Sequence, residues 1–276
     1  MPNPGLMSPE QAIIFALLGA GISIYAISVG AGGGFLFTPL LLLWYEDADP
    51  AAITMAALSV VALNSAAAAA LAARARLLDY PVILVLLAAA LPGSLIGALG
   101  TSVLPRSAFA AIFAALLIAV GVHLIWRPVH HFGGPLRHGW PRRFRDGEGN
   151  RVAYRLPLRR SVMATTATAA VASLTGIGGG LLYTPMATSV MRMPHALAAP
   201  TAYAVIAGMA LTAVTVHAAL GSAEQPMWAV PPLAAGALVG GSVGWRFQRR
   251  SRQSTLTRLL AVGLIAIGVR SALLAV

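Results

Sequence analysis

Long apolar segments follow one another along this chain, and short polar stretches separate them. Several segments hold about 20 apolar residues, enough for a helix to cross a hydrocarbon core about 30 Å thick. They are rich in Ala and Leu without strict alternation, which favours helices over barrel strands. The predicted segments are 9–29, 34–45, 51–73, 80–100, 105–126, 160–175, 180–191, 196–220, 227–246 and 255–275.

The composition agrees with a membrane location. The chain is 58% hydrophobic and 10% charged, whereas a soluble domain carries about a quarter charged residues. Its start, Met1-Pro2-Asn3-Pro4, lacks the basic region of a secretory signal peptide, so the first apolar segment is predicted to be retained. Without cysteine, disulfides and thiolate metal sites are excluded. We therefore predict an all-α polytopic membrane protein.

The arginines predict the topology, because basic residues collect on the cytoplasmic side of membrane proteins. The strongest clusters lie in 127–160 and 246–258, so both stretches are predicted to be cytoplasmic. An even number of membrane crossings must separate two cytoplasmic stretches. This condition is met if 160–191 forms a hairpin that enters and leaves the membrane on the same face, and the same rule applied to 9–45 orients the whole chain. We therefore predict a multi-pass protein of the inner (plasma) membrane with both termini outside. The residues then predicted outside include Glu46, Asp47, Asp49, Glu224 and Arg106.

The chain divides into two related halves around a polar centre. Residues 1–126 form the first predicted transmembrane repeat, 127–159 a basic cytoplasmic loop, and 160–276 the second repeat. Each repeat holds one hairpin and three full crossings. Because three is odd, the second repeat is inverted relative to the first, as in many secondary transporters. In the loop, 144–154 resembles a β-hairpin around a glycine-rich turn; a flexible tether is the alternative.

A ten-residue pattern occurs once in each half, as Gly-Ala-Gly-Gly-Gly-Phe-Leu-Phe-Thr-Pro at 30–39 and Gly-Ile-Gly-Gly-Gly-Leu-Leu-Tyr-Thr-Pro at 176–185. Each glycine costs a helix about 1 kcal/mol relative to Ala, so the triplets predict helix breaks. The prolines at the end of each pattern, Pro39 and Pro185, are expected to kink or end a local run of helical hydrogen bonds. The helix after each break would present unpaired N–H groups and the positive end of its dipole, which bind anions without a charged side chain.

Two hairpins entering from opposite faces would aim these amides at one point near the midplane of the membrane. The alternative is that the glycines serve only close helix contact. On the first interpretation, the predicted substrate-binding residues are the glycines, hydroxyls and one phenol at the two breaks: Ser28, Gly32, Gly33, Gly34, Thr38, Thr175, Gly178, Gly179, Gly180, Tyr183 and Thr184.

Asp, Glu, Lys and Arg are missing from the middle of every predicted span. Such residues normally mark ion and proton pathways, so their absence disfavours a cation carrier and a carboxylate proton relay. His123, His195 and His217 are the candidate titratable groups, either as interfacial residues or as proton carriers. Asn64 and Tyr203 are further polar groups at membrane depth, and an interhelical hydrogen bond is one expected role for Asn64.

Two more patterns repeat in the halves. Ala-x-x-Thr begins the third segment of each half, ending at Thr54 and Thr201. Small residues four apart recur in the fourth segments, where they let transmembrane helices pack closely. These latter pairs are Gly93 with Gly97 and Gly236 with Gly240.

The doubled Gly-x-Gly-Gly-Gly-x-x-x-x-Pro pattern resembles the TauE/SafE family of sulfite exporters, and the Ala-x-x-Thr stretches are similar to the family pattern. A small Gly-Thr-Ser group often follows there, from which Ile53-Thr54-Met55 and Pro200-Thr201-Ala202 depart. The resemblance implies a transporter for sulfite, organosulfonates or related small anions, commonly in the direction of export. A thiosulfate-uptake branch with a similar plan relies on cysteines, which this chain lacks.

We therefore predict a secondary transporter of a small anion such as sulfite or an organosulfonate. Export is the simpler direction, because an inside-negative potential drives an anion outward by about 2.3 kcal/mol per charge per 100 mV. A passive anion channel, or an importer of a sulfur oxyanion or carboxylate, is the alternative. No enzymatic activity, cofactor, metal or nucleic-acid partner is expected. The expected partners are the anion and the lipid bilayer, and a coupling ion such as a proton and a homo-oligomer stay open.

Overall fold

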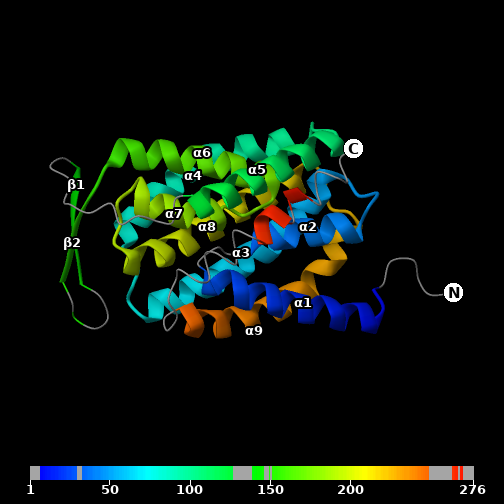
Figure 1. Ribbon diagram of the computed structural model, residues 1–276, viewed down its shortest axis with the longest axis horizontal. Coiled ribbons are helices and arrows are strands. Elements are labelled where there is room, and N and C mark those ends of the chain that lie inside the picture. Colours follow the sequence, from blue (N-terminus) through cyan, green and yellow to red (C-terminus); the bar gives the residue numbers. More distant parts are fainter. Residues whose placement is uncertain are drawn as a thin grey trace.

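The computed structural model describes residues 7–29, 33–126, 139–145, 149, 151–248, 263–266 and 268–269. Within these ranges the protein is helical apart from one two-stranded sheet (Figure 1). The elements are α1 (Pro9–Ser28), α2 (Gly34–Trp44), α3 (Pro50–Arg74), α4 (Tyr80–Thr101), α5 (Arg106–Trp126), β1 (Trp140–Arg145), β2 (Arg151–Leu156), α6 (Leu158–Thr175), α7 (Gly180–Ser189), α8 (His195–Ala219), the 3₁₀ helix η1 (Gln225–Ala229) and α9 (Val230–Gln248).

These bounds confirm the first nine predicted segments to within a few residues, with η1 and α9 together forming the ninth. Most of the tenth, 255–275, lies outside the described residues. Five helices of the described chain are long and apolar enough to cross a membrane, by length and composition. They are Pro9–Ser28, Pro50–Arg74, Tyr80–Thr101, Ala196–Ala219 and Gln225–Gln248.

Helix starts are fixed by local sequence. The Ser8 hydroxyl accepts a hydrogen bond from the Gln11 amide at 3.2 Å, and the Gln11 side chain accepts one from the Ser8 amide. This reciprocal cap satisfies two amides that the first turn of α1 leaves without partners. The Asp49 carboxylate accepts from the Ala51 amide at 2.7 Å, just before Pro50 begins α3. Proline is favoured there because its fixed φ suits a first helical turn.

Helices from the two halves pack as close parallel pairs. In the pair α1–α9, a Cβ on Gly236 would overlap the Ala16 carbonyl oxygen, and one on Gly240 would overlap that of Ala20. The numbers rise together on both helices, so the pair is parallel. The predicted packing role of these glycines is confirmed.

The pair α4–α6 repeats this arrangement. A Cβ on Gly93 would overlap the Thr166 carbonyl oxygen, and one on Gly97 would overlap that of Ala170. The first helix of each half therefore packs, in parallel, against the fourth segment of the other half.

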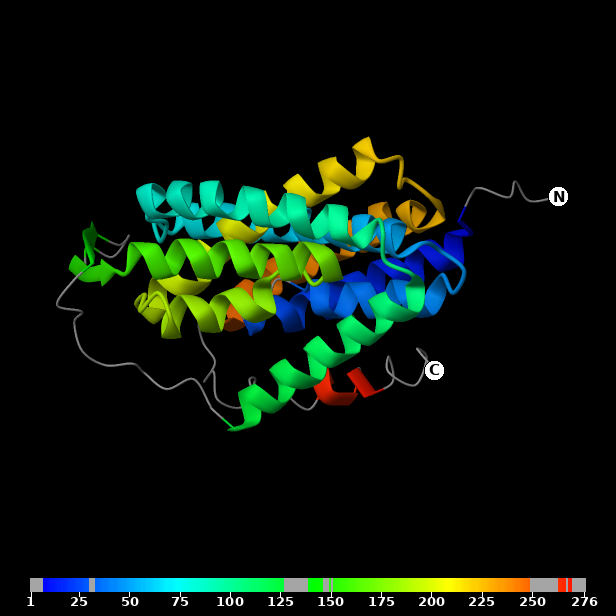
Figure 2. The same ribbon diagram turned by 90° about the horizontal axis from the view of Figure 1, so that it is seen from above.

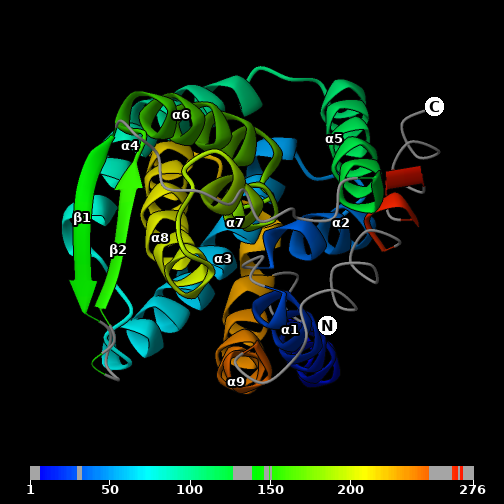
Figure 3. The same cartoon turned by 60° about the vertical axis from the view of Figure 1, so that its left-hand side comes forward.

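The helices α3 and α8 form the middle of the bundle. They pack against each other, with α9 and α1 beyond α3 and with α4 and α6 beyond α8 (Figure 3). The helix α5 runs obliquely, apart from the α4–α6 pair (Figure 2). Its inward side chains Phe113 and Leu117 join a separate apolar cluster with Phe35 of α2 and Leu181 of α7.

Charged residues separate to the two ends of the bundle. Glu46, Asp47 and Glu224 line one pocket of about 570 Å³. Nearby, the Arg106 guanidinium donates to the Ala48 carbonyl at 2.6 Å. We call this the acidic end. The other end, where α3 finishes at Arg74 and the strands lie, is called the arginine end (Figure 1).

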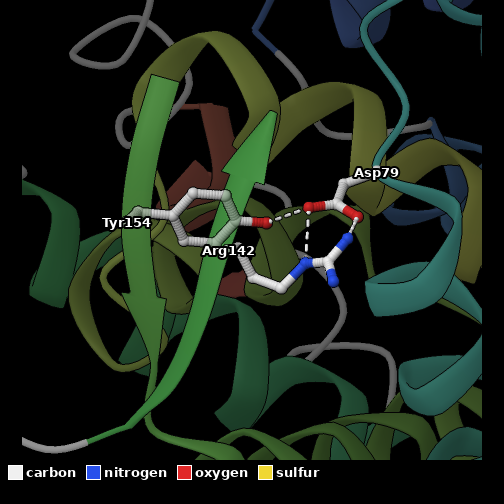
Figure 4. A network of polar contacts seen from close by, with 3 residues as sticks. All are labelled: Asp79, Arg142 and Tyr154. Atoms are coloured by element: carbon white, nitrogen blue, oxygen red, sulfur yellow. Dashed lines mark hydrogen bonds and ion pairs between the residues drawn. The ribbon is translucent and has the colours of Figure 1, made fainter. Parts of the chain in front are cut away.

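The predicted β-hairpin is confirmed and is longer than expected. The two strands pair antiparallel, from Trp140 opposite Leu156 to Arg145 opposite Arg151. Their inward side chains pack against the main core. Arg142 also forms a two-point contact with Asp79, with Nε 3.1 Å and Nη2 2.5 Å from the carboxylate oxygens (Figure 4).

Candidate functional site

The two glycine breaks belong to hairpins that enter the bundle from opposite ends (Figure 1). The helix α1 starts at the acidic end, and α2 returns to it. The helix α6 starts beside the strands at the arginine end, and α7 returns there.

The backbone at the breaks takes conformations that suit only glycine. Gly33, which caps α2, has a φ of 100°, and Gly179, which caps α7, has a φ of 74°. In the second break, Gly176 and Gly178 are also left-handed, at 72° and 70°. Side chains are strained in this region, which is why both patterns need glycine. Gly34 and Gly180 begin the helices, whereas Gly32 lies outside the described residues.

Both short helices present their first amides in the same way. In each, the third and fourth residues donate to the carbonyl of the capping glycine, Gly33 or Gly179, at 2.6–3.2 Å. The first two amides precede this ladder and have no acceptor within their own helix. They carry the positive end of the helix dipole and suit an anion. These amides belong to Gly34, Phe35, Gly180 and Leu181.

The two breaks contact each other inside the protein. The Thr38 hydroxyl donates to the Gly176 carbonyl at 2.9 Å, which ties α2 to the second break. A Cβ on Gly34 would overlap the Ile177 carbonyl oxygen. Val61 of α3 lies against both Gly34 and Gly178. We call this buried meeting point the glycine crossing.

Two of the predicted site hydroxyls donate hydrogen bonds within their own helices. The Ser28 hydroxyl donates to the Ile24 carbonyl at 2.6 Å, and that of Thr175 donates to the Val171 carbonyl at 2.7 Å. Both side chains are buried. A hydroxyl has one proton, so each retains only acceptor capacity toward a ligand in this arrangement.

The remaining predicted side chains lie in α7. Tyr183 is fully buried, and its hydroxyl lies 3.1 Å from the Thr165 hydroxyl of α6. Thr184 is half-buried. Of the predicted residues, Gly34 and Thr38 therefore contact the second break, and Gly178 shares the neighbour Val61 with Gly34. Gly33 and Gly179 have other nearest neighbours, and the Tyr183 hydroxyl contacts α6.

Two threonines outside the predicted set have unusual surroundings. Thr54 and Thr201 are both 0% exposed, and within the described chain neither hydroxyl has a hydrogen-bond partner. Thr54 lies beside the second break: a Cβ on Gly176 would be 3.4 Å from its Cα and Cγ2. The repeated Ala-x-x-Thr pattern was the sequence signal for both residues.

The other polar groups at membrane depth have mostly structural contacts. Asn64 accepts a hydrogen bond from Ser23 at 2.7 Å, the predicted interhelical bond. The Tyr203 hydroxyl donates to the Ile27 carbonyl at 3.0 Å. His217 is buried without a partner among the described residues. The side chains of His123 and His195 lie outside the described set, and within that set no three His, Cys, Asp or Glu side chains gather around a metal position.

These features define a polytopic α-helical membrane protein with a paired, glycine-capped helix crossing at its centre. The family model of the sulfite exporter TauE/SafE matches residues 14–271, so the chain belongs to the TauE/SafE family of membrane transporters.

A curated relative agrees with this assignment. The chain is 23% identical over 262 residues to the "Probable membrane transporter protein YunE" of Bacillus subtilis strain 168, an alignment that covers 93% of this chain and 95% of the relative. No solved structure matches the chain.

Proposed function

We propose that this membrane transporter carries a small anion, such as sulfite or an organosulfonate, which binds at the glycine crossing. The observation that carries the proposal is the contact between α2, near its glycine-capped start, and the second glycine break, on hairpins that enter from opposite ends. Helix dipoles and the first amides of the two helices can hold an anion there without a cationic side chain. The substrate-binding groups are the first amides of the two helices, those of Gly34, Phe35, Gly180 and Leu181. The capping Gly33 and Gly179, with Gly32 and Gly178, complete the two triplets.

The mechanism we propose is alternating access by two inverted repeats, 1–126 and 160–276. It is supported by the exchange of packing partners, in which α1 packs on α9 and α6 packs on α4. It is also supported by the opposite directions of α1 and α6 between the two ends (Figure 1). Movement of one repeat against the other would expose the crossing first to one side and then to the other.

The arginine end is proposed to face the cytoplasm of a cell with an inner (plasma) membrane. The observations that favour this side are Arg74, Arg76 and the arginines of the β-hairpin, because cytoplasmic loops carry an excess of basic residues. In this orientation α1 starts outside, and the membrane potential favours export of an anion. We propose a carrier without an enzymatic step or a cofactor.

The first experiment is flux in proteoliposomes at a set membrane potential, with sulfite, sulfoacetate, thiosulfate, sulfate and formate offered in turn. Saturable, voltage-dependent flux of a sulfur anion is the expected result. Exchange of labelled for unlabelled anion against a gradient would establish a carrier, and flux without such exchange would establish a passive channel. Folded protein that moves none of the sulfur anions would overturn the proposed substrate class.

Substitutions at the capping glycines test the site itself. A Cβ on Gly33 would lie 2.8 Å from the Phe37 ring, one on Gly179 would overlap the Met209 methyl group, and both positions have positive φ. We expect Gly33→Leu and Gly179→Leu to abolish flux while the protein still inserts into the membrane. The matched control is Gly21→Leu on α1, where a Cβ meets nothing within 4 Å. Normal flux in both capping variants would restrict the glycines to a packing role.

A further inference from the structure

Threonine hydroxyls inside membrane helices usually donate to a carbonyl one turn earlier, as Thr175 does to Val171. Thr54 and Thr201 differ, because both are fully buried and neither hydroxyl has a partner among the described residues. They are the two threonines in the described chain with this property. They also occupy the same place in the Ala-x-x-Thr pattern of the two halves.

We propose that the hydroxyls of Thr54 and Thr201 donate hydrogen bonds to the transported anion at two separate stations, one on each side of the glycine crossing. This inference rests on the proposed function. A buried hydroxyl without a partner costs about 1–3 kcal/mol. That cost is removed when an anion with acceptor oxygens lies beside the hydroxyl.

The station at Thr54 is formed by α3 and the second break. Its Cα and Cγ2 lie 3.4 Å from the position of a Cβ on Gly176, which has none. Thr38 holds this break in place, because its hydroxyl donates to the Gly176 carbonyl. The Thr38 proton is therefore used, whereas that of Thr54 is available.

The station at Thr201 belongs to α8, the helix that contacts the end of α1 through Tyr203. Tyr203, two residues further along α8, donates to the Ile27 carbonyl at 3.0 Å, directly before the first break. The side chain of Thr201 is as buried as that of Thr54. Each central helix thus carries one buried hydroxyl without a partner among the described residues.

The two hydroxyls cannot contact one small anion at the same time. The helices α3 and α8 run in opposite directions between the two ends (Figure 1). At 1.5 Å per residue, Thr54 lies about 6 Å from the start of α3 and Thr201 about 9 Å from the start of α8. Because each helix is about 37 Å long, the hydroxyls are about 20 Å apart along the bundle. Thr54 therefore serves the acidic end and Thr201 the arginine end.

The test measures the half-saturating sulfite concentration from each side, in right-side-out and inside-out membrane vesicles, with sulfoacetate as a second probe. Thr54→Val and Thr201→Val keep the side-chain shape and remove the hydroxyl. We expect Thr54→Val to raise the half-saturating sulfite concentration about tenfold at the acidic end, and Thr201→Val to raise it about tenfold at the arginine end. Thr54→Ser and Thr201→Ser, which keep a hydroxyl, should restore the wild-type values.

A second measurement separates binding from folding. Without anion, both valine variants should melt at or above the wild-type temperature, because an unsatisfied hydroxyl is replaced by a methyl group. The stabilisation that saturating sulfite gives should shrink. The control is Ser94→Ala, which removes another buried hydroxyl without a partner, on α4, and should leave transport unchanged.

Each remaining outcome is decisive. Wild-type flux with unchanged half-saturation in both valine variants would overturn the threonine stations and leave the proposed transporter intact. Equal effects of both variants from both sides would overturn the two-station arrangement, because it would indicate one shared site. A wild-type protein that neither moves nor is stabilised by the anions would overturn the proposed function and the stations with it.

Discussion

Single hydrogen bonds decide how the glycine crossing is held. The Thr38 hydroxyl is fully buried and joins α2 to the second break through the Gly176 carbonyl. A carbonyl in a non-helical break has no hydrogen-bond donor from its own helix. Removing the one donor that it has is therefore costly inside the membrane. This bond therefore connects the two hairpins as well as positioning one side chain.

Thr38→Val should destabilise the protein by about 1–3 kcal/mol, because it leaves the buried Gly176 carbonyl without its donor. The measurement is unfolding of purified protein in detergent. Thr212→Val is the control, since the Thr212 hydroxyl donates to the Gly208 carbonyl within its own helix at 2.9 Å, where the helical ladder also serves that carbonyl. If Thr38→Val is no less stable than Thr212→Val, the contact does not hold the hairpins together.

The sequence predicted the glycines of the crossing better than its hydroxyls. A run of three glycines has a local cost in a helix, so the breaks and the starts of α2 and α7 were predictable. The partner of a hydroxyl depends on which carbonyl lies near it after folding. For that reason Ser28 and Thr175, adjacent to the breaks, donate within α1 and α6, whereas Thr54 has no partner among the described residues.

The β-hairpin is held to the bundle by polar contacts with one buried carboxylate. Asp79, just before α4, accepts from Arg142 of β1 and from the Tyr154 hydroxyl of β2 at 2.8 Å (Figure 4). Burial, and then the hydrogen bond to Asp79, raise the pKa of Tyr154 above its ordinary value. The hydrogen bond to Asp79 also raises the pKa of Arg142. The β-hairpin is thereby docked rather than tethered.

Asp79→Asn should release the β-hairpin, because Arg142 then loses its charged partner and hydrogen bonds to charged groups are worth about 1.5–3 kcal/mol. The chain has no cysteine, so Ala153→Cys on the exposed face can carry a single spin label whose mobility reports docking. We expect a mobile label in Asp79→Asn and an immobile one in the control Arg143→Gln, which alters an exposed side chain. An immobile label in both would show that apolar packing alone holds the strands.

The same label should reveal a pH dependence with a definite sign. The docked β-hairpin favours neutral Tyr154, whose pKa is raised, so this contribution is complete below the ordinary tyrosine pKa of about 10. It declines as the pH rises further, since the released tyrosine loses its proton first. Mobility should therefore increase above about pH 10, and Tyr154→Phe should remove that increase.

Helix bounds followed from hydropathy, whereas helix partners did not. The length of each apolar segment and the helix-breaking residues at its ends are local features of the sequence, so each helix from α1 to α9 could be predicted separately. The pairing of α1 with α9 joins segments from opposite ends of the chain. The small-residue spacing at Gly236 and Gly240 indicated a close contact, but only the fold identifies Ala16 and Ala20 of α1 as its partners.

If the molecule is built from two inverted repeats, as we propose, the two glycine-mediated helix pairs should respond equally to equivalent substitutions. Gly240→Ala would drive a Cβ into the Ala20 carbonyl oxygen, and Gly97→Ala would drive one into that of Ala170. Because both obstacles are backbone atoms, neither can move aside, and the parallel helices must separate. We expect both variants to lose folded yield and thermal stability to a similar extent, measured by size-exclusion fluorescence after heating.

The control for these variants is Gly21→Ala on α1, where a Cβ meets nothing within 4 Å. It should stabilise the helix by up to about 1 kcal/mol, because alanine replaces glycine without a clash. If Gly240→Ala lost much thermal stability and Gly97→Ala lost none, the two helix pairs would not contribute equally to stability. In that case the two helix pairs would be unrelated contacts, and the inverted-repeat mechanism would lose its main support.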